Sequence, residues 1–312
     1  MTDSFATNGA GREQGGSHEI DRHRLIDDLL RLAHEEDVGG GDLSAALLQS
    51  PDAPATFRIL MKQPGVFAGC EVIPRLLPLY GGELSLDWAE GVTDGWRMSE
   101  GMQEVGTVKG PVGSILTMER VMLNVLQRLC GVATVTRRFV DAVAGTTAEI
   151  LDTRKTIPGW RVLDKYAVRC GGGRNHRMGL HDAVMIKDNH FSGAEGRLMA
   201  AEVFHILNRL LESRVRPAFV EVEVDDIEQM ESVMSVLGVD VILLDNFDPD
   251  ELRQAVEMRD GHGLRGKIAL EASGGIDLSS VRAVAETGVD RISVGALTHS
   301  APAIDLSLER VT

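Results

Sequence analysis

Cationic side chains gather in one segment of this chain, residues 151–190, which reads LDTRKTIPGWRVLDKYAVRCGGGRNHRMGLHDAVMIKDNH. The chain as a whole is acidic, with 32 Lys and Arg against 47 Asp and Glu and a formal charge of -15. The segment reverses that balance through Arg154, Lys155, Arg161, Lys165, Arg169, Arg174, Arg177 and Lys187. Arg and Lys bind phosphate and carboxylate groups through charge-assisted hydrogen bonds. We therefore expect this segment to bind a small, highly charged anion.

Two groups of residues in the segment are candidates for contacting the anion. Arg154 and Lys155 follow an apolar run, where they are either anion ligands or ordinary surface charges, and their place after a strand favours the first interpretation. Gly171–Gly173 precede His176 and Arg177. A glycine run lets the backbone approach an anion closely, although it also makes a flexible turn.

Lys187 ends the apolar run AVMIKD. An isolated lysine at a strand end is either a Schiff-base nucleophile, which requires desolvation, or an anion ligand. The other cations nearby in the sequence favour anion binding.

Histidines in the same segment raise the question of a metal site. The candidate ligands are His176, His181 and His190, with Cys170 and Asp182 nearby. Their spacing fits no zinc pattern, and the surrounding cations would repel a metal ion. We expect no zinc here.

Alternating strands and helices are expected from residue 144 onward to position these groups. The strand candidates are the short apolar runs AEILDT, AVMIKD, AFVEVEV, VDVILLDN, KIALEAS and DRISVG, and the helix candidates are 196–211, 226–237, 250–258 and 278–287. Six such units in succession favour a closed or nearly closed α/β barrel. A doubly wound open sheet is the alternative, but none of the strand candidates is followed by the GxGxxG fingerprint that marks the switch point of such a sheet.

Every strand candidate ends in polar residues or glycine. In chain order these are Asp152, Thr153, Arg154 and Lys155; Lys187, Asp188 and Asn189; Glu221 and Glu223; Asp245 and Asn246; Glu271, Ser273, Gly274 and Gly275; and Ser293, Gly295 and Ala296. In α/β barrels the loops after the strands build the active site, so these residues predict one catalytic face.

Paired carboxylates are expected on that face. Glu223 and Asp245 follow successive strands, so they could stabilise a positively charged carbon or hold Mg²⁺. Alternatively they form salt bridges with Arg154 and Lys187. Glu221 shares the strand face of Glu223, and the sequence alone does not separate the two.

Two glycine-containing turns predict a phosphate site. They are Ser273, Gly274 and Gly275, and Val294, Gly295 and Ala296, and we expect each to open a helix whose free N–H groups bind phosphate. With the cationic segment, they suggest a phosphorylated sugar beside an anionic ring.

The first half of the chain predicts a smaller α+β unit. A helix begins near Asp21 and ends at Gly39–Gly41, and short apolar runs follow it, including PVGSILTM (111–118). Residues 119–143 predict one or two helices, with Gly131 marking a break. Residues up to about Glu19 are rich in Gly, Ser and Thr, which is typical of a flexible tail.

Composition excludes several classes of protein. Net acidity argues against nucleic-acid binding, because phosphate backbones require a basic surface. Neither a signal peptide nor an apolar run long enough to span a membrane is present in the sequence. Three cysteines without CxxC spacing are expected to be reduced thiols. We expect a cytoplasmic protein with no nucleic-acid or membrane partner.

These motifs resemble one family closely, the quinolinate phosphoribosyltransferases. The resemblance is carried by DTRKTIPGWRVLDKYAVRCGGGRNHR, HDAVMIKDNH, VEVEV, ILLDNF, LEASGGI and GVDRISVGALTHS, and by EEDVGGGDLS and ERVMLNVLQRLCGVAT earlier in the chain. It implies an N-terminal α/β sandwich domain and an incomplete, open α/β barrel of the type II phosphoribosyltransferase kind. We accordingly divide the chain into a tail (1–20), a sandwich domain (21–131) and a catalytic barrel (132–312).

The resemblance also implies an activity and its partners. Quinolinate and phosphoribosyl pyrophosphate would give nicotinate mononucleotide, pyrophosphate and CO2, with Mg²⁺ required. Family members are homodimers, assembled further in some cases, and the neighbour's N-terminal domain helps close each site.

Residue roles follow from the matching motifs. Arg120 would reach the quinolinate of the adjacent subunit, while Thr153, Arg154, His176, Arg177 and Lys187 would line the pocket for the dicarboxylate and pyrophosphate. Lys155 would lie near the reacting groups, Glu223 and Asp245 would face the ribose and its metal, and the two glycine-containing turns would hold the 5-phosphate. Ile157 and Trp160 depart from the commoner family residues, which concerns the shape of the pocket.

Three other functions stay open from the sequence. A molybdenum-associated paralogue shares the fold, although the full RKT, NHR and KDNH set favours the quinolinate enzyme. A Schiff-base aldolase would use Lys187 or Lys155. A noncatalytic anion-binding protein would bind phosphoribosyl pyrophosphate without releasing pyrophosphate.

Overall fold

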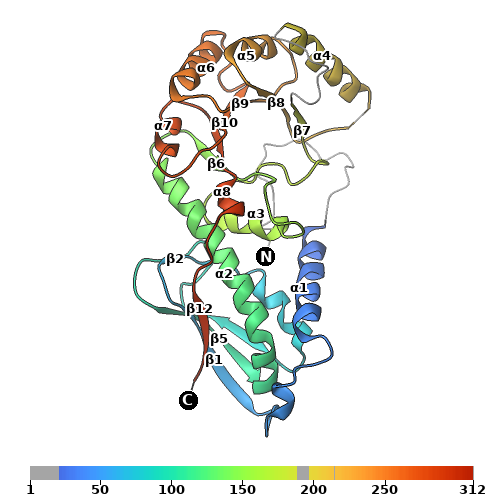
Figure 1. The fold of residues 1–312 in the computed structure, drawn as a ribbon, viewed down its shortest axis with the longest axis vertical. Helices are drawn as coiled ribbons and strands as arrows, with labels where there is room; N and C mark the ends of the chain where they lie inside the picture. The colour runs from blue at the N-terminus through green and yellow to red at the C-terminus, as the bar shows by residue number, and fades with distance from the viewer. Residues whose placement is uncertain (1–20, 188–196, 214, 312) are drawn as a thin grey trace.

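Two units joined by one long helix make up the chain. The computed structural model describes residues 21–187, 197–213 and 215–311. Figure 1 shows a barrel-like unit at one end, a smaller sheet unit at the other, and helix α2 (Val112–Ala142) running from one to the other.

The smaller unit is built on a four-stranded sheet with the order β12-β1-β5-β3. These strands are β12 (Leu306–Arg310), β1 (Pro54–Met61), β5 (Gln103–Pro111) and β3 (Ser85–Trp88), and the short pair β2 (Gly65–Val66) and β4 (Arg97–Met98) lies outside the sheet. The 3-10 turns are η1 (Ala45–Leu47), η2 (Ile73–Arg75) and η3 (Leu77–Tyr80). The expectation of an α+β unit is confirmed.

Helix α1 (Arg22–Val38) has the ends that its sequence predicts. The Asp21 side chain accepts a hydrogen bond from the Arg24 N–H at 3.0 Å, which caps the start. Gly39, at φ 51, ends the helix and donates its N–H to the Glu35 carbonyl oxygen. Ile26 and Leu30 are fully buried, so this helix contributes one apolar face to the core.

Helix α2 is continuous, so the predicted break at Gly131 is wrong. A side-chain carbon at Gly131 would lie 2.2 Å from the Pro302 carbonyl oxygen, so glycine here permits another segment of backbone to approach the helix. The apolar run 111–118 forms the first two turns of the same helix.

Six parallel strands form the barrel unit, in the order β6-β11-β10-β9-β8-β7. They are β6 (Glu149–Leu151), β11 (Arg291–Ser293), β10 (Ala269–Ser273), β9 (Val241–Asp245), β8 (Val220–Val224) and β7 (Val184–Ile186). The helices are α3 (Arg161–Cys170), α4 (Arg197–Glu212), α5 (Ile227–Met234), α6 (Pro249–Gly261), α7 (Val281–Ala285) and α8 (Ala296–His299). All six predicted strands are confirmed, and β6 and β7 lie at opposite edges of the sheet, so the barrel is open.

The end of the chain returns to the smaller unit. Strand β12 pairs antiparallel with β1, with Leu308 opposite Ile59, and Figure 1 shows the C-terminus at the far end from the barrel. Helix α2 also runs through the predicted boundary at residue 131. The division at that residue stays a prediction, while the tail 1–20 lies outside the described residues.

Buried Val, Ile, Leu and Met side chains form one continuous core through both units. Among the residues that the structure describes, no helix is both long and apolar enough to cross a membrane.

Candidate active site

Strand register places the polar strand ends on one face of the sheet. Ser273 is opposite Asp245, and Glu223 is opposite Leu243, two residues before Asp245. Because side chains on one strand alternate between faces, Glu221 shares this face with Glu223. The carboxylates and Ser273 therefore line the interior of the open barrel at successive levels.

The structure separates the two glutamates of β8. Glu223 forms an ion pair with Lys187, and their side chains are 16% and 38% exposed. Glu221 is fully buried and lies deeper, against His176. The alternative interpretation, that a strand-end carboxylate forms a salt bridge with Lys187, is thus confirmed for Glu223.

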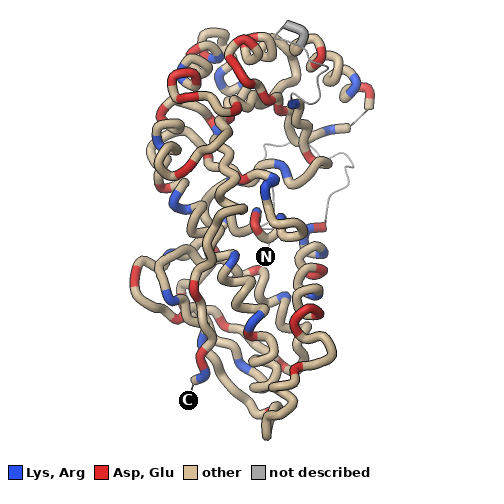
Figure 2. Tube along the Cα trace, in the orientation of Figure 1, with Lys and Arg blue, Asp and Glu red and all other residues tan. Residues whose placement is uncertain are grey.

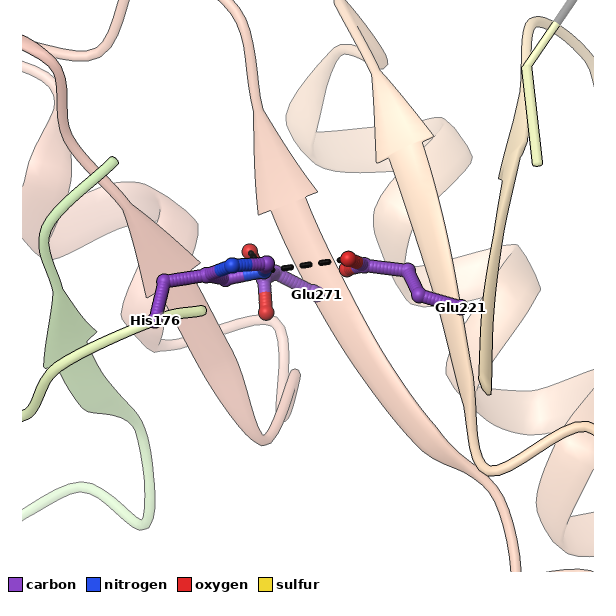
Figure 3. Close-up of side chains that lie close together, drawn as sticks. All are labelled: His176, Glu221 and Glu271. Carbon is purple, nitrogen blue, oxygen red and sulfur yellow. Dashed lines mark ion pairs between the residues drawn. The ribbon is translucent and has the colours of Figure 1, made fainter. Parts of the chain in front are cut away.

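His176 meets two buried carboxylates inside the barrel. Its Nε2 atom lies 3.0 Å from Glu221 Oε2 and 3.4 Å from Glu271 Oε1, and Figure 3 shows the three side chains pointing toward one another. Burial opposes a charge on the ring, but the adjacent carboxylates raise the pKa of His176 to about 10. Burial and the neighbouring Glu271 also raise the pKa of Glu221. The three side chains therefore share a proton at neutral pH, because both the imidazole and Glu221 hold one more tightly than they would in water.

The other ring nitrogen of His176 is engaged within its own loop. Nδ1 accepts a hydrogen bond from the Arg177 N–H at 2.8 Å. A proton on Nδ1 would break this bond, so the geometry places the cluster's protons between Nε2 and the carboxylates. Burial and the nearby Arg154 lower the pKa of Arg177, so the two arginines lie within electrostatic range of each other.

Asp152 fixes the backbone of the loop before Arg177. Its carboxylate pairs with Lys165 and accepts hydrogen bonds from Asn175 Nδ2 at 2.6 Å and from the His176 N–H at 2.9 Å. Burial raises the pKa of Asp152 and lowers that of Lys165. Lys165 is fully enclosed, so it supports the site and does not contact substrate.

Other cations of the segment are also committed to protein groups. Arg161 donates to the Met178 carbonyl oxygen at 3.1 Å, Arg169 to Asn175 Oδ1 at 2.7 Å, and Arg174 pairs with Glu149 at 2.8 Å. Figure 2 shows acidic positions along the helices around the barrel, whereas Lys and Arg positions occur on the loops beside α3. The predicted cationic cluster is real, but six of its eight members have partners within the protein, namely these three arginines, Lys165, Arg177 and Lys187.

The run Gly171–Gly173 approaches helix α2 and not an anion. A side-chain carbon at Gly171 would lie 2.5 Å from the Ala133 carbonyl oxygen, and one at Gly173 would lie 2.7 Å from Thr136 Cγ2. Close packing against α2 therefore accounts for Gly171 and Gly173, while the anion-binding role of the run stays a prediction.

Lys155 lies beside the turn Val294–Ala296. Its Cδ would be 3.1 Å from a side-chain carbon at Gly295, and its carbonyl oxygen accepts a hydrogen bond from Thr298 Oγ1 at 2.8 Å. The Lys155 N–H donates to Thr153 Oγ1 at 3.0 Å. The first and last strand ends are thereby brought together, with the exposed Lys155 side chain between them.

The turn after β10 does not open a helix as predicted. Gly274 and Gly275 have φ values of 99 and 57, and α7 begins only at Val281. A side-chain carbon at Gly274 would lie 2.1 Å from Asn246 Oδ1, so this turn packs tightly against the end of β9. Of the two glycine-containing turns, only the one ending in Ala296 starts a helix, α8.

Arg120 lies apart from the barrel interior of its own chain. It is exposed on α2, three residues after Thr117, whose hydroxyl donates to Asp42 Oδ2 at 2.9 Å in the smaller unit. Arg128, two turns further along α2, is the residue that reaches the barrel unit, through Asp164 at 3.0 Å. Asp188, Asn189 and His190 of the KDNH motif lie outside the described residues.

Glu221 and Glu271 both belong to the predicted catalytic face, but the sequence gives neither of them a specific role. Both occupy the middle of apolar strands, where an ionised carboxylate is costly unless it has a partner. That cost is a signal in the sequence that a buried partner must exist, but it does not identify His176 as that partner.

An open α/β barrel with cationic loops and carboxylates at one mouth defines this chain as a barrel protein whose site suits anionic substrates. Residues 132–309 match the family described as "Quinolinate phosphoribosyl transferase, C-terminal domain", and residues 42–130 match the corresponding N-terminal domain. The chain belongs to the quinolinate phosphoribosyl transferase family.

Individual relatives cover nearly the whole chain. A nicotinate-nucleotide pyrophosphorylase [carboxylating] of Mycobacterium leprae is 40% identical over 284 residues, covering 91% of this chain and 96% of its own. A probable enzyme of the same name from Bacillus subtilis is 37% identical, covering 92% and 94%. The solved nicotinate-nucleotide pyrophosphorylase of Francisella tularensis superposes with a TM-score of 0.82 at 36% identity, covering 96% of this chain and all of that one.

Proposed function

We propose that this chain transfers the phosphoribosyl group of phosphoribosyl pyrophosphate to quinolinate and decarboxylates the product. The products are nicotinate mononucleotide, pyrophosphate and CO2, as in the carboxylating pyrophosphorylases that it resembles over nine-tenths of its length. The observation that carries the proposal is the barrel interior, where Lys187 and Glu223 pair at the level below Asp245 and Ser273. Cations beside carboxylates suit a reaction in which an anion departs from a carbon that becomes positive.

The cationic loops are proposed to bind the two anionic substrates. Arg154 and Arg177 lie within electrostatic range of each other, which suits a planar dicarboxylate, because two guanidinium groups can each bind a carboxylate in bidentate geometry. Thr153, His176 and Lys187 complete this pocket, and Lys155 lies near the reacting groups. The turns Ser273–Gly275 and Val294–Ala296 are proposed to hold the 5-phosphate.

Glu223 and Asp245 are proposed to face the ribose and Mg²⁺. Carboxylate oxygens are the ligands that Mg²⁺ prefers, so the donor set fits the ion. Glu223 is already paired with Lys187, which favours contact with the ion through water or ribose hydroxyls. When bound, Mg²⁺ neutralises the charge of the departing pyrophosphate.

Positioning and electrostatics suffice for the chemistry, with no covalent nucleophile. Loss of pyrophosphate leaves oxocarbenium character at the ribose, which Glu223 and Asp245 stabilise, and the pyridine nitrogen attacks that carbon. The nitrogen becomes cationic, so the ring can hold the electron pair left when the adjacent carboxylate departs as CO2. A proton then replaces the carboxylate on the ring.

A homodimer with shared sites is proposed from the smaller unit. Leu43 and Leu47 are 84% and 86% exposed and follow Asp42, whose carboxylate accepts a hydrogen bond from Thr117 of α2. Leu116 is 38% exposed and precedes Thr117 on that helix. Exposed apolar clusters of this kind are typical of subunit interfaces. Arg120, on the same stretch of helix, would then reach the neighbour's dicarboxylate, and sedimentation of the purified chain would test the dimer.

A cytoplasmic location is proposed from chemistry alone. Cys70, Cys130 and Cys170 are free thiols, and such thiols persist in a reducing compartment.

Product analysis tests the proposed function. The chain is incubated with quinolinate, phosphoribosyl pyrophosphate and Mg²⁺, and the products are separated by ion-exchange chromatography. We expect nicotinate mononucleotide and pyrophosphate in equal amounts. Binding of phosphoribosyl pyrophosphate without either product would leave only an anion-binding role.

A further inference from the structure

At the base of the proposed pocket lies a charged cluster of which the proposed reaction uses His176 but neither of the two carboxylates. It consists of His176, whose side chain is 5% exposed, and of Glu221 and Glu271, which are fully buried. Figure 3 shows the two carboxylates coming from different strands, β8 and β10, and meeting the ring that the loop extends toward them. The loop is thereby attached to the barrel wall at two points.

The ring also has a tight packing environment. Its plane is nearly perpendicular to that of Phe219, with the ring centroids 5.3 Å apart. Together with the carboxylates, this contact leaves the imidazole a single orientation. A ring held this way can position whatever its remaining nitrogen contacts.

That remaining nitrogen contacts the backbone of Arg177. The Arg177 N–H donates to His176 Nδ1 at 2.8 Å, and the guanidinium extends to the Ala183 carbonyl oxygen at 3.3 Å. Glu221 also stabilises the charge of Arg177 by its own negative charge. Glu221 therefore acts on Arg177 both through the ring and directly, whereas Glu271 acts through the ring.

A metal ion is the alternative occupant of this cluster. Three ligand atoms, one from each residue, lie within 4.8 Å of one another, which is close enough for coordination. A histidine that binds metal through Nε2 normally donates its Nδ1 proton to an acceptor. Here Nδ1 accepts a hydrogen bond from the Arg177 N–H, so it lacks the acceptor that orients a metal-binding ring, and this geometry favours positioning over coordination.

We infer that Glu221 and Glu271 are positioning residues, which hold the His176 ring so that it fixes the Arg177 backbone and orients the Arg177 guanidinium for the substrate dicarboxylate. This inference rests on the proposed function for the identity of that dicarboxylate. The two carboxylates do not touch substrate, so they affect its binding through another residue.

Four variants test the inference, Glu221→Gln, Glu221→Ala, Glu271→Gln and Glu271→Ala. The Gln variants keep an oxygen facing Nε2 at the ion-pair distance, whereas the Ala variants remove it. The matched control is Glu149→Gln, because Glu149 pairs with Arg174 of the same loop at 2.8 Å but is 39% exposed. Circular dichroism and thermal unfolding establish which variants fold, and the Gln variants carry the test if the Ala variants do not.

The readouts are the Kd for quinolinate by calorimetry, and KM and kcat for CO2 release. We expect each Ala variant to raise the Kd and KM for quinolinate about tenfold or more, the effect of losing one charged contact with the ring. The kcat at saturation and the KM for phosphoribosyl pyrophosphate should change less than about threefold. The Gln variants should recover most of the affinity, and Glu149→Gln should match wild type.

Several results would overturn the inference. Ala variants with wild-type Kd, or with an equal fall in kcat at unchanged KM, would show that the carboxylates do not position the binding arginine. One equivalent of metal in the purified wild type, lost in Glu271→Gln, would assign the cluster to metal binding. Wild type that binds quinolinate but releases no CO2 would remove the proposed function alone, and wild type that does not bind it would remove both.

Discussion

Replacing Asp152 by Asn should lower the free energy of unfolding more than the same change at an exposed ion pair. Asp152 and Lys165 form an ion pair in which neither side chain is exposed. Burial raises the pKa of Asp152 and lowers that of Lys165, so each charge persists because of the other. Removing one partner leaves the other as an uncompensated buried charge, which costs about 3–5 kcal/mol.

The magnitude follows from a double-mutant cycle. Asp152→Asn and Lys165→Met should each lower the free energy of unfolding by about 3–5 kcal/mol, so independent effects would add to about 6–10 kcal/mol. The double variant buries no charge and keeps one oxygen for the His176 N–H but loses the bond from Asn175, so it should cost about 1–2 kcal/mol.

Urea unfolding followed by circular dichroism measures all four proteins. The control is Asp87→Asn, because Asp87 pairs with Lys109 at 2.9 Å while the two side chains are 63% and 53% exposed. That change should cost less than about 1 kcal/mol. A cost of less than about 1 kcal/mol for Asp152→Asn, or a double variant as unstable as the sum, would refute the reasoning.

Three further predictions follow from the structure. Gly131→Ala gains about 1 kcal/mol of helix propensity but places a carbon 2.2 Å from a backbone oxygen. Thermal unfolding should therefore show a net loss of stability of about 1–3 kcal/mol. The control Gly261→Ala places a carbon with nothing within 4 Å and should not destabilise the chain. Lys155→Ala and Glu223→Ala should each reduce kcat far more than they reduce stability, since both lie at the barrel mouth; wild-type turnover by either variant would remove that residue's role. Burial raises the pKa of Asp164 to about 6 from 3.8, so the folded chain binds a proton that the unfolded chain has released. The free energy of unfolding of wild type should therefore fall by about 3 kcal/mol between pH 4 and pH 7 relative to that of Asp164→Asn. Equal pH dependence of the two proteins in urea unfolding would contradict this.

The barrel could be predicted from the sequence because its strands are short, apolar and bounded by polar turns. VEVEV and VILLD appear as β8 and β9 within one or two residues of the predicted ends. The polar residues after them lie on one face because parallel strands share a direction, and register then brings Ser273 opposite Asp245. Short apolar runs bounded by polar turns are sufficient to predict these strands.

Glycines were interpreted less well, because their role depends on contacts distant in sequence. Gly131 was predicted to break a helix, yet it lets residues near Pro302 pack against α2. For Gly171 and Gly173 the sequence leaves an anion site and a flexible turn open, and it gives no sign that both glycines pack against Thr136 of that same helix. Nothing local distinguishes a glycine that bends the chain from one that admits a neighbour.

The buried cluster was beyond prediction for a related reason. His176 was separated from Glu221 and Glu271 by whole βα units, so their contact follows only from the order of strands in the sheet. The same holds for β12, whose pairing with β1 brings residues 306–310 beside residues 57–61. Long-range pairing, and not residue type, determines these features.

The central claim, that decarboxylation depends on phosphoribosyl transfer in this site, is tested most directly with quinolinate labelled with ¹⁴C in the carboxylate next to the nitrogen. The purified chain is incubated with this substrate, with and without phosphoribosyl pyrophosphate and Mg²⁺, and trapped ¹⁴CO2 is counted. We expect release only when all three components are present. Release without phosphoribosyl pyrophosphate, or no release from folded wild-type protein, would contradict the account.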